Sequence, residues 1–308
     1  MEPGQLGPPL ILPDFVLPSR VNQRWEYSGI DSIDYCIDKH HFNQYPYPIT
    51  YNYNSRGFRD QEWPDSIDQL KTAIWCVGDS FTVGIGNPLK HTWPWLLQNQ
   101  TNLRTINVSM DGASNNWIAR KTVEILQKIN PQHIVIHWSY THRREADPTT
   151  VYNLRWNNFY QDIKDPSWPD CPTMQEVDNL PARIRHEILT WPDPLPWPDS
   201  LPTISDEDLR QKYLPDATID DDLINTTECI NRVVQASTGT KIIHSFIPEF
   251  CQNTHKIQQH LVQHQVNFIP EFSRLDLARD SHHYDIKTSQ YFVNLIVAKL
   301  AEVQSTVL

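Results

Sequence analysis

From residue 71 onward, short apolar runs alternate with segments in which apolar residues recur every three or four positions. A short apolar run bounded by polar residues predicts a buried strand, and the longer periodicity predicts a helix with one apolar face. The pattern predicts five strands, at residues 71–77, 103–109, 132–138, 240–247 and 266–269. It also predicts helices at residues 117–129, 223–234 and 290–303.

Alternating strands and helices favour an α/β fold, in which a mostly parallel sheet carries helices on both faces. Sheets of this kind bind ligands at the carboxyl ends of their strands. We therefore expect the chemistry to lie in the loops that follow the strands. The helix at 117–129 has Ser114 or Asn115 as its expected N-cap, because both side chains accept hydrogen bonds from free backbone N–H groups.

Prolines mark the segments that fall outside this pattern. The chain has 24 prolines and only 9 glycines, and prolines rigidify irregular backbone. We predict a proline-rich arm and lead-in over residues 1–60 and a main domain over 61–308. The arm is a candidate contact for an oligomer or a larger assembly.

The main domain contains an insertion at about 146–215, which holds three of the four Trp-Pro-Asp triplets of the chain. The insertion is either a lid or platform whose tryptophans stack on a ligand, or a segment that buries its own tryptophans.

Charge and cysteine content narrow the function classes. The net charge is −11 and no cluster of basic residues occurs, so we expect neither nucleic acid nor an anionic membrane as a partner. Five widely spaced cysteines predict free thiols, with no disulfide framework and no zinc site. Prolines interrupt every apolar stretch near the N-terminus. We therefore expect cytoplasmic synthesis without a signal peptide, and no membrane span.

Three loops contain residues that suit nucleophilic catalysis. Ser80 follows the first predicted strand in Gly-Asp-Ser, where a tight turn into a helix would expose its hydroxyl and direct its N–H towards an oxyanion. Gly112 follows the second strand, and a glycine there lets the backbone N–H approach a developing oxyanion closely. Each of these signals alone is more often an ordinary turn.

The third loop, Asp280-Ser281-His282-His283, precedes the last predicted helix. An Asp three residues before a His can accept the His Nδ1–H and leave Nε2 free to take a serine proton. We favour His283 as the base, with His282 as the alternative. The other interpretation is that Asp280 caps a turn and that both histidines lie on the surface.

Taken together, these loops resemble blocks one, two and five of the SGNH/GDSL hydrolase family. The segment Asn-Ser-Arg-Gly-Phe-Arg-Asp at residues 54–60 also resembles a lead-in that a subset of the family carries. The resemblance covers roughly residues 50–145 and 220–300. It implies a flavodoxin-like three-layer α/β/α sandwich with a five-stranded sheet, and the hydrolysis of esters without a metal or other cofactor.

By matching positions, the resemblance makes Ser80 the nucleophile, His283 the general base and Asp280 its orienting partner. The backbone N–H groups of Ser80 and Gly112 would bind the oxyanion. One departure stands out, because the family's third block supplies an Asn donor in Gly-x-Asn-Asp and residues 137–145 contain no Asn. The candidates for the missing donor are Asn115 and the hydroxyl groups of residues 139–141, with Ser139 first.

The loss of one oxyanion donor costs on the order of 10²–10³ in rate. The sequence Trp-Ser-x-x-x-Arg-x-Glu from residue 138 resembles a variant third block in some phage-associated SGNH-like proteins. The leading hypothesis is a serine esterase for an O-acetyl or short acyl ester, with an ester-bearing small molecule or glycan as its substrate. The alternatives are a binding or structural protein on the same scaffold, such as a component of a viral particle or a glycan-binding protein, and an acyltransferase.

Overall fold

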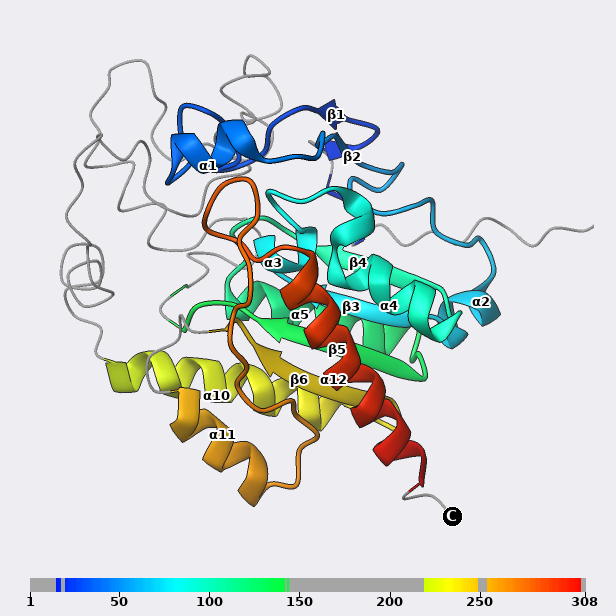
Figure 1. The fold of residues 1–308 in the computed structure, drawn as a ribbon. Helices are drawn as coiled ribbons and strands as arrows, with labels where there is room; N and C mark the ends of the chain where they lie inside the picture. Colours follow the sequence, from blue (N-terminus) through cyan, green and yellow to red (C-terminus); the bar gives the residue numbers. More distant parts are fainter. Residues whose placement is uncertain (1–14, 18–19, 142, 144–218, 249–253, 306–308) are drawn as a thin grey trace, which may run out of the picture.

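The computed structural model describes residues 15–17, 20–141, 143, 219–248 and 254–305. Its centre is a parallel sheet with the strand order β4-β3-β5-β6 (Figure 1). The strands of this sheet are β3 (Ile74–Gly78), β4 (Thr105–Ser109), β5 (His133–Trp138) and β6 (Lys241–Phe246). The whole of the predicted insertion at 146–215 and the first fourteen residues of the arm lie outside the described residues.

The parallel sheet and four of the five predicted strands are confirmed. In place of the fifth strand there is a single parallel bridge between His244 of β6 and Phe268. The His244 N–H donates to the carbonyl of Asn267 over 2.9 Å, and the Ile269 N–H donates to the carbonyl of His244 over 2.8 Å.

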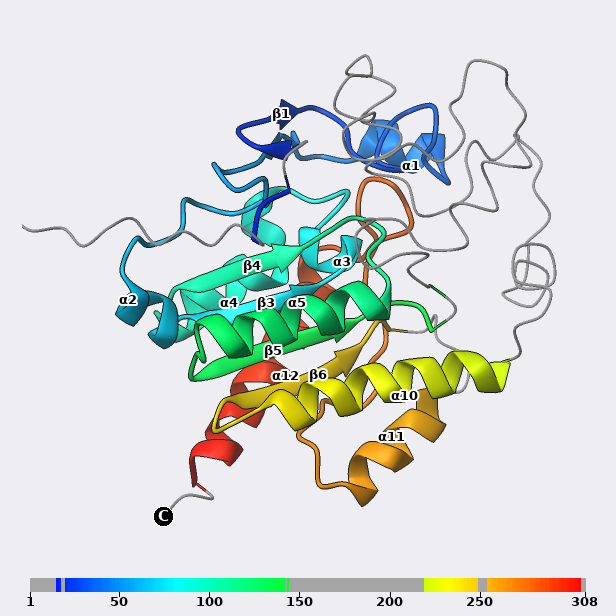
Figure 2. The same ribbon diagram turned by 180° about the vertical axis from the view of Figure 1, so that it is seen from behind.

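Helices cover both faces of the sheet and complete three layers (Figures 1 and 2). One face carries α5 (Asn115–Lys128) and α10 (Ile219–Ala236), which contact each other. The other face carries α4 (Trp93–Thr101) and α12 (Ile286–Ser305), which also contact each other. A further helix, α11 (Thr254–Gln263), packs beside α10. The three predicted helices are therefore confirmed; α10 and α12 extend beyond their periodic segments at both ends, and α5 begins two residues earlier and ends one residue earlier than predicted.

The sheet separates two apolar cores. In β3, Trp75 and Val77 join the core under α5 and α10, whereas Ile74 and Cys76 join the core under α4 and α12. A strand that faces apolar cores on both sides shows a continuous apolar run, which is why β3 was visible in the sequence. β4 (Thr105–Ser109) is also buried throughout but alternates, because its three polar side chains form hydrogen bonds on one face.

The lead-in forms short elements that lie above the elbow helix α3 (Ser80–Val83) in Figure 1. These elements are β1 (Arg24–Trp25), α1 (Lys39–Gln44) and β2 (Tyr51–Asn52), and β1 pairs with β2 in antiparallel fashion. The short helix α2 (Ile67–Thr72) lies apart from them, directly before β3. A 3₁₀ turn, η2 (Leu89–His91), follows α3.

The lead-in is anchored to the main domain by buried side chains. Phe15 is fully buried, with its ring centroid 6.0 Å from that of Trp75, and Tyr51 packs with Val83 and Ile85. Trp63, in the Trp-Pro-Asp triplet outside the insertion, is also buried. The domain boundary near residue 60 stays a prediction. Within the described part of the chain, no helix is long and apolar enough to cross a membrane.

Candidate active site

Ser80 lies at the start of α3, where β3 ends. Asp79 is the N-cap of this helix, and its side chain accepts a hydrogen bond from the N–H of Phe81 over 3.1 Å. The turn needs a glycine before it, because a Cβ on Gly78 would lie 2.9 Å from the carbonyl oxygen of His137. The sequence therefore forms the tight strand-to-helix turn that was predicted around Ser80. Ser80 is only 3 % exposed, however, which is less than the exposed hydroxyl expected at such a turn.

Arg59 holds the far end of α3 in place. Its guanidinium group is buried and donates to the carbonyl oxygens of Val83 (3.2 Å), Gly84 (2.5 Å) and Asn87 (2.6 Å). The guanidinium group thereby bonds the carbonyls at the end of α3 and in the loop that follows it. Sequence reasoning noted the segment 54–60 only for its resemblance to a family lead-in, and it missed this role.

The Asp280–His283 loop is closed by its own hydrogen bonds. The Nδ1 atom of His283 lies 2.6 Å from Oδ2 of Asp280. The other carboxylate oxygen accepts the backbone N–H groups of His282 (2.9 Å) and His283 (3.0 Å). Ser281 adopts a left-handed conformation with φ of 62°, which turns the chain tightly enough for these contacts.

The charges of this loop support one another. Burial disfavours the charged imidazolium, but the charge and hydrogen bond of Asp280, together with the charges of Asp111 and Asp79, raise the pKa of His283 overall. Burial likewise acts to raise the pKa of Asp280, but His283 holds it below its usual value. His282 has a different contact, because its Nε2 lies 3.1 Å from the hydroxyl of Tyr140. Of the two histidines, the structure therefore pairs His283 with the carboxylate.

The elbow and the loop meet across a close contact. The ring centroids of Phe81 and His283 are 4.6 Å apart, and a Cβ on Gly86 would lie 3.0 Å from the carboxylate carbon of Asp280. Among the described residues, no hydrogen bond joins Ser80 Oγ to His283 Nε2, which is buried without a partner. Hydrogen bonds of this kind commonly tighten only in the complex with a substrate.

The two predicted side-chain donors for an oxyanion have other partners. The side-chain carbonyl of Asn115 accepts the N–H of Ser139 over 2.8 Å, and its amide nitrogen lies 3.2 Å from the hydroxyl of Thr226. The Ser139 hydroxyl donates to Asp79 over 2.7 Å. Gly112 follows β4 with φ of 76°, as a tight turn requires. Backbone N–H groups are thus the simpler source of oxyanion donors.

A buried ion pair lies behind the elbow, and sequence reasoning missed it. Arg143 Nη1 is 3.2 Å from the Asp79 carboxylate and 3.0 Å from the Ser139 hydroxyl. Burial raises the pKa of Asp79, and Arg143 and Ser139 offset only part of that rise. The only sequence signal was the four-residue spacing of Ser139 and Arg143 at the end of β5.

Asp111 lies next to Gly112, near the site. Its Oδ2 atom is buried and has no hydrogen-bond partner among the described residues. Burial raises the pKa of Asp111 to about 7, although Arg20, His283 and Arg143 act to lower it. A buried polar atom without a partner is uncommon in a folded protein and asks for an explanation.

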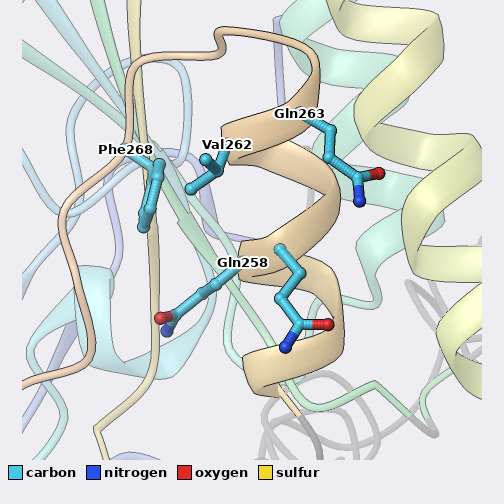
Figure 3. A pocket seen from close by; sticks show the side chains of 5 residues that line it. Gln258, Val262, Gln263 and Phe268 are labelled. Atoms are coloured by element: carbon cyan, nitrogen blue, oxygen red, sulfur yellow. The ribbon is translucent and has the colours of Figure 1, made fainter.

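A hollow beside α11 is the wrong place for this chemistry. Figure 3 shows glutamine side chains, Val262 and Phe268 around it. None of the predicted site residues lines the hollow, and no lining residue titrates. It therefore offers no candidate for catalysis.

Three features now stand in one arrangement: a Gly-Asp-Ser elbow after β3, a glycine turn after β4, and an Asp-x-x-His loop before α12. All three follow the order of the SGNH blocks, on a parallel sheet with helices on both faces. The chain has an SGNH hydrolase-like fold.

Comparisons with known proteins give matches in structure only. No model of a protein family matches this chain, and no curated protein sequence matches it. The chain is similar to a putative lipolytic protein of the G-D-S-L family from Desulfitobacterium hafniense DCB-2, at 10 % identity and a TM-score of 0.39 over 74 % of this chain and 99 % of that one.

Two esterase structures are similar to a comparable degree. The psychrotrophic esterase EstA from Pseudoalteromonas sp. matches at 13 % identity and a TM-score of 0.40, over 76 % of this chain and 99 % of that one. A family two carbohydrate esterase from Clostridium thermocellum, in complex with cellohexaose, matches at 12 % identity and 0.43, over 80 % and 67 %. At these identities the activity has to be argued from the residues of this chain.

Proposed function

We propose that this SGNH-like protein is a serine hydrolase that cleaves carboxylic esters. Ser80 is the nucleophile, His283 the general base and Asp280 the group that orients the base. The observation that carries the proposal is the buried contact of 2.6 Å between His283 Nδ1 and the Asp280 carboxylate. This contact holds a proton on Nδ1, so that Nε2 is the ring nitrogen left to accept a proton.

The proposed reaction has two steps, acylation of Ser80 and hydrolysis of the acyl-enzyme. Ser80 Oγ attacks the ester carbonyl while its proton passes to His283 Nε2, and the N–H groups of Ser80 and Gly112 stabilise the oxyanion. The tetrahedral intermediate collapses to an acyl-enzyme when His283 returns the proton to the leaving alcohol. Water attacks the acyl-enzyme with the same base, and the acid and the free Ser80 hydroxyl are released.

The raised pKa of His283 suits this cycle. A base whose conjugate acid is stabilised by Asp280 takes up the serine proton more readily, and the buried carboxylate stays ionised because its own pKa is lowered. For the substrate we propose an O-acetyl or short acyl ester with a carbohydrate as its alcohol. This choice rests on the family resemblance and on the Trp-Pro-Asp triplets of the sequence.

A non-catalytic or weakly active binding protein on the same scaffold is the second candidate. It is favoured by the missing hydrogen bond between Ser80 and His283 and by the other partners of Asn115 and Ser139. A glycan-binding protein or a component of a viral particle would use the scaffold in this way.

Labelling with a fluorophosphonate probe tests the proposal, alongside acetate release from 4-nitrophenyl acetate. Wild type is compared with Ser80→Ala, His283→Ala and the control Ser66→Ala, since Ser66 is exposed and its side chain makes no cap hydrogen bond. We expect labelling and turnover in wild type and the control only. A well-folded wild type that neither labels nor turns over would favour the binding protein instead.

A further inference from the structure

A buried ion pair joins the N-terminal lead-in to the loop that contains Asp280. Arg279 donates through Nε to one carboxylate oxygen of Asp31 and through Nη2 to the other, each over 2.7 Å. The Asp31 side chain is fully buried. The pair adds little net stability, because the attraction must first offset the lost hydration of the fully buried Asp31 carboxylate. Its planar, two-point geometry instead fixes orientation.

The same pair is connected to the elbow through Tyr51. The Tyr51 hydroxyl donates to Asp31 over 2.5 Å and accepts the N–H of Gly86 over 2.8 Å. The N–H of Arg279 donates to the carbonyl of Gly86 over 3.0 Å. Both backbone groups of Gly86 are therefore held by this network, at the point where the elbow turn approaches the Asp280 carboxylate.

Two more contacts tie neighbouring residues of the loop to the lead-in. The N–H of Ile37 donates to the carbonyl of Asp280 over 3.2 Å, and His41 Nε2 lies 2.9 Å from the carbonyl of Ala278. Three consecutive residues, 278–280, are thus each bonded to the lead-in. None of these contacts involves an atom of the proposed reaction.

We propose that the Asp31–Arg279 pair and Tyr51 are positioning residues. They hold the loop at residues 278–280 against the lead-in, and thereby keep the Asp280 carboxylate in contact with His283. The proposal rests on the proposed function, and it assigns to the lead-in a role in the reaction. A shift of the loop by a fraction of an ångström would lengthen the contact between His283 and Asp280. The proton on Nδ1 would then be held less firmly, although every reacting group would remain in place.

The test uses proton NMR of the His283 Nδ1–H together with the rate of fluorophosphonate labelling. A proton in a short contact with a carboxylate resonates far downfield, and His283→Ala assigns it by its loss. We expect Arg279→Gln and Asp31→Asn to shift or broaden this resonance and to slow labelling roughly 10- to 100-fold. Arg279→Lys keeps the charge without the two-point geometry, so it should not restore either readout.

Arg104→Gln is the matched control, because Arg104 pairs with the buried Asp60 at the amino end of β4. It should leave the resonance and the labelling rate unchanged. If Arg279→Gln fails to fold, Tyr51→Phe removes one hydroxyl, keeps the ion pair, and should produce the same changes in smaller degree.

The positioning role would be overturned if folded Arg279→Gln kept both the wild-type resonance and the wild-type labelling rate. If Arg279→Gln does not fold, the same result in folded Tyr51→Phe would overturn it. Failure of the proposed function is distinguishable, because wild type would then fail to label while its resonance still responded to the Arg279 variants.

Discussion

The two halves of the candidate site are built in opposite ways. The acid–base half consists of the Asp280–His283 contact, with hydrogen bonds to the lead-in on the outer side of the loop. The proposed oxyanion half would consist of the backbone turns at Ser80 and Gly112, because the side chains of Asn115 and Ser139 are bonded elsewhere. Under the proposed function, the groups for proton transfer are therefore in contact before a substrate binds, whereas the oxyanion would depend on main-chain N–H groups.

The lack of a side-chain oxyanion donor would lower the rate of ester hydrolysis. General acid–base catalysis contributes roughly 10²–10⁴, and one missing oxyanion donor removes on the order of 10²–10³. The arrangement therefore fits a hydrolase that attacks an activated or strained ester, or one whose binding energy comes from contacts remote from the reacting carbonyl.

Asp280→Asn disrupts the contact between Asp280 and His283 and should have the largest effect on the rate. The amide no longer fixes the Nδ1–H tautomer of His283, so we expect the rate of labelling and of ester hydrolysis to fall by about 10⁴. Circular dichroism checks the fold, and Asp34→Asn, at an exposed position, is the control. A loss of less than tenfold would show that Asp280 does not orient the base.

Arg143→Met tests the support behind the oxyanion half. Removing one partner leaves the Asp79 carboxylate buried without its cation, and we expect a loss of about 3–5 kcal/mol in the free energy of unfolding. Urea denaturation measures it. Adding Asp79→Asn removes the stranded charge, so the double variant should be more stable than Arg143→Met; equal stabilities would contradict the pairing.

Asp111→Asn tests the carboxyl group beside Gly112. Burial raises its pKa in the folded protein to about 7, so its contribution to stability is full below the unfolded value and is lost as pH rises through 7. Wild type should therefore lose up to about 4 kcal/mol relative to Asp111→Asn between pH 4 and pH 8. Urea denaturation at several pH values measures the difference, and parallel curves would contradict it.

Ser139→Ala should have the smallest effect and sharpens the comparison. The Ser139 hydroxyl is bonded to Asp79 and supplies no hydrogen bond to an oxyanion. We therefore expect less than about a tenfold loss in kcat, compared with the 10²–10³ of a true donor. Steady-state kinetics with 4-nitrophenyl acetate decides between the two, and a loss of 10² or more would place the hydroxyl at the oxyanion.

The features that could be predicted from the sequence are those determined by residues close together in the chain. Strands buried on both faces leave a continuous apolar run, and the three-residue spacing of Asp280 and His283 is itself the geometry of their contact. The fifth strand was predicted from its apolar residues alone. In the structure this segment makes a single bridge to β6.

The missed features all depend on contacts between distant residues. Asp79 and Arg143 are 64 residues apart, and no pattern in either segment predicts that the two side chains pair. Asn115 was expected as a cap or an oxyanion donor. In the structure Ser114 is the cap, and the Asn115 amide joins α5 to the end of β5, a choice that only the packing of those elements decides.

The separation of Asp31 and Arg279 also determines when the site can form. The two residues are 248 positions apart, so a ribosome has made Asp31 and Tyr51 long before Arg279 and His283 leave its tunnel. During that interval the carboxylate of Asp31 has no guanidinium partner and the lead-in has no loop to bind. Contacts over such distances in sequence form slowly. We therefore expect the Asp280–His283 contact to form late in synthesis, and a nascent chain in which the Ser80 elbow is already folded would still lack the proposed base.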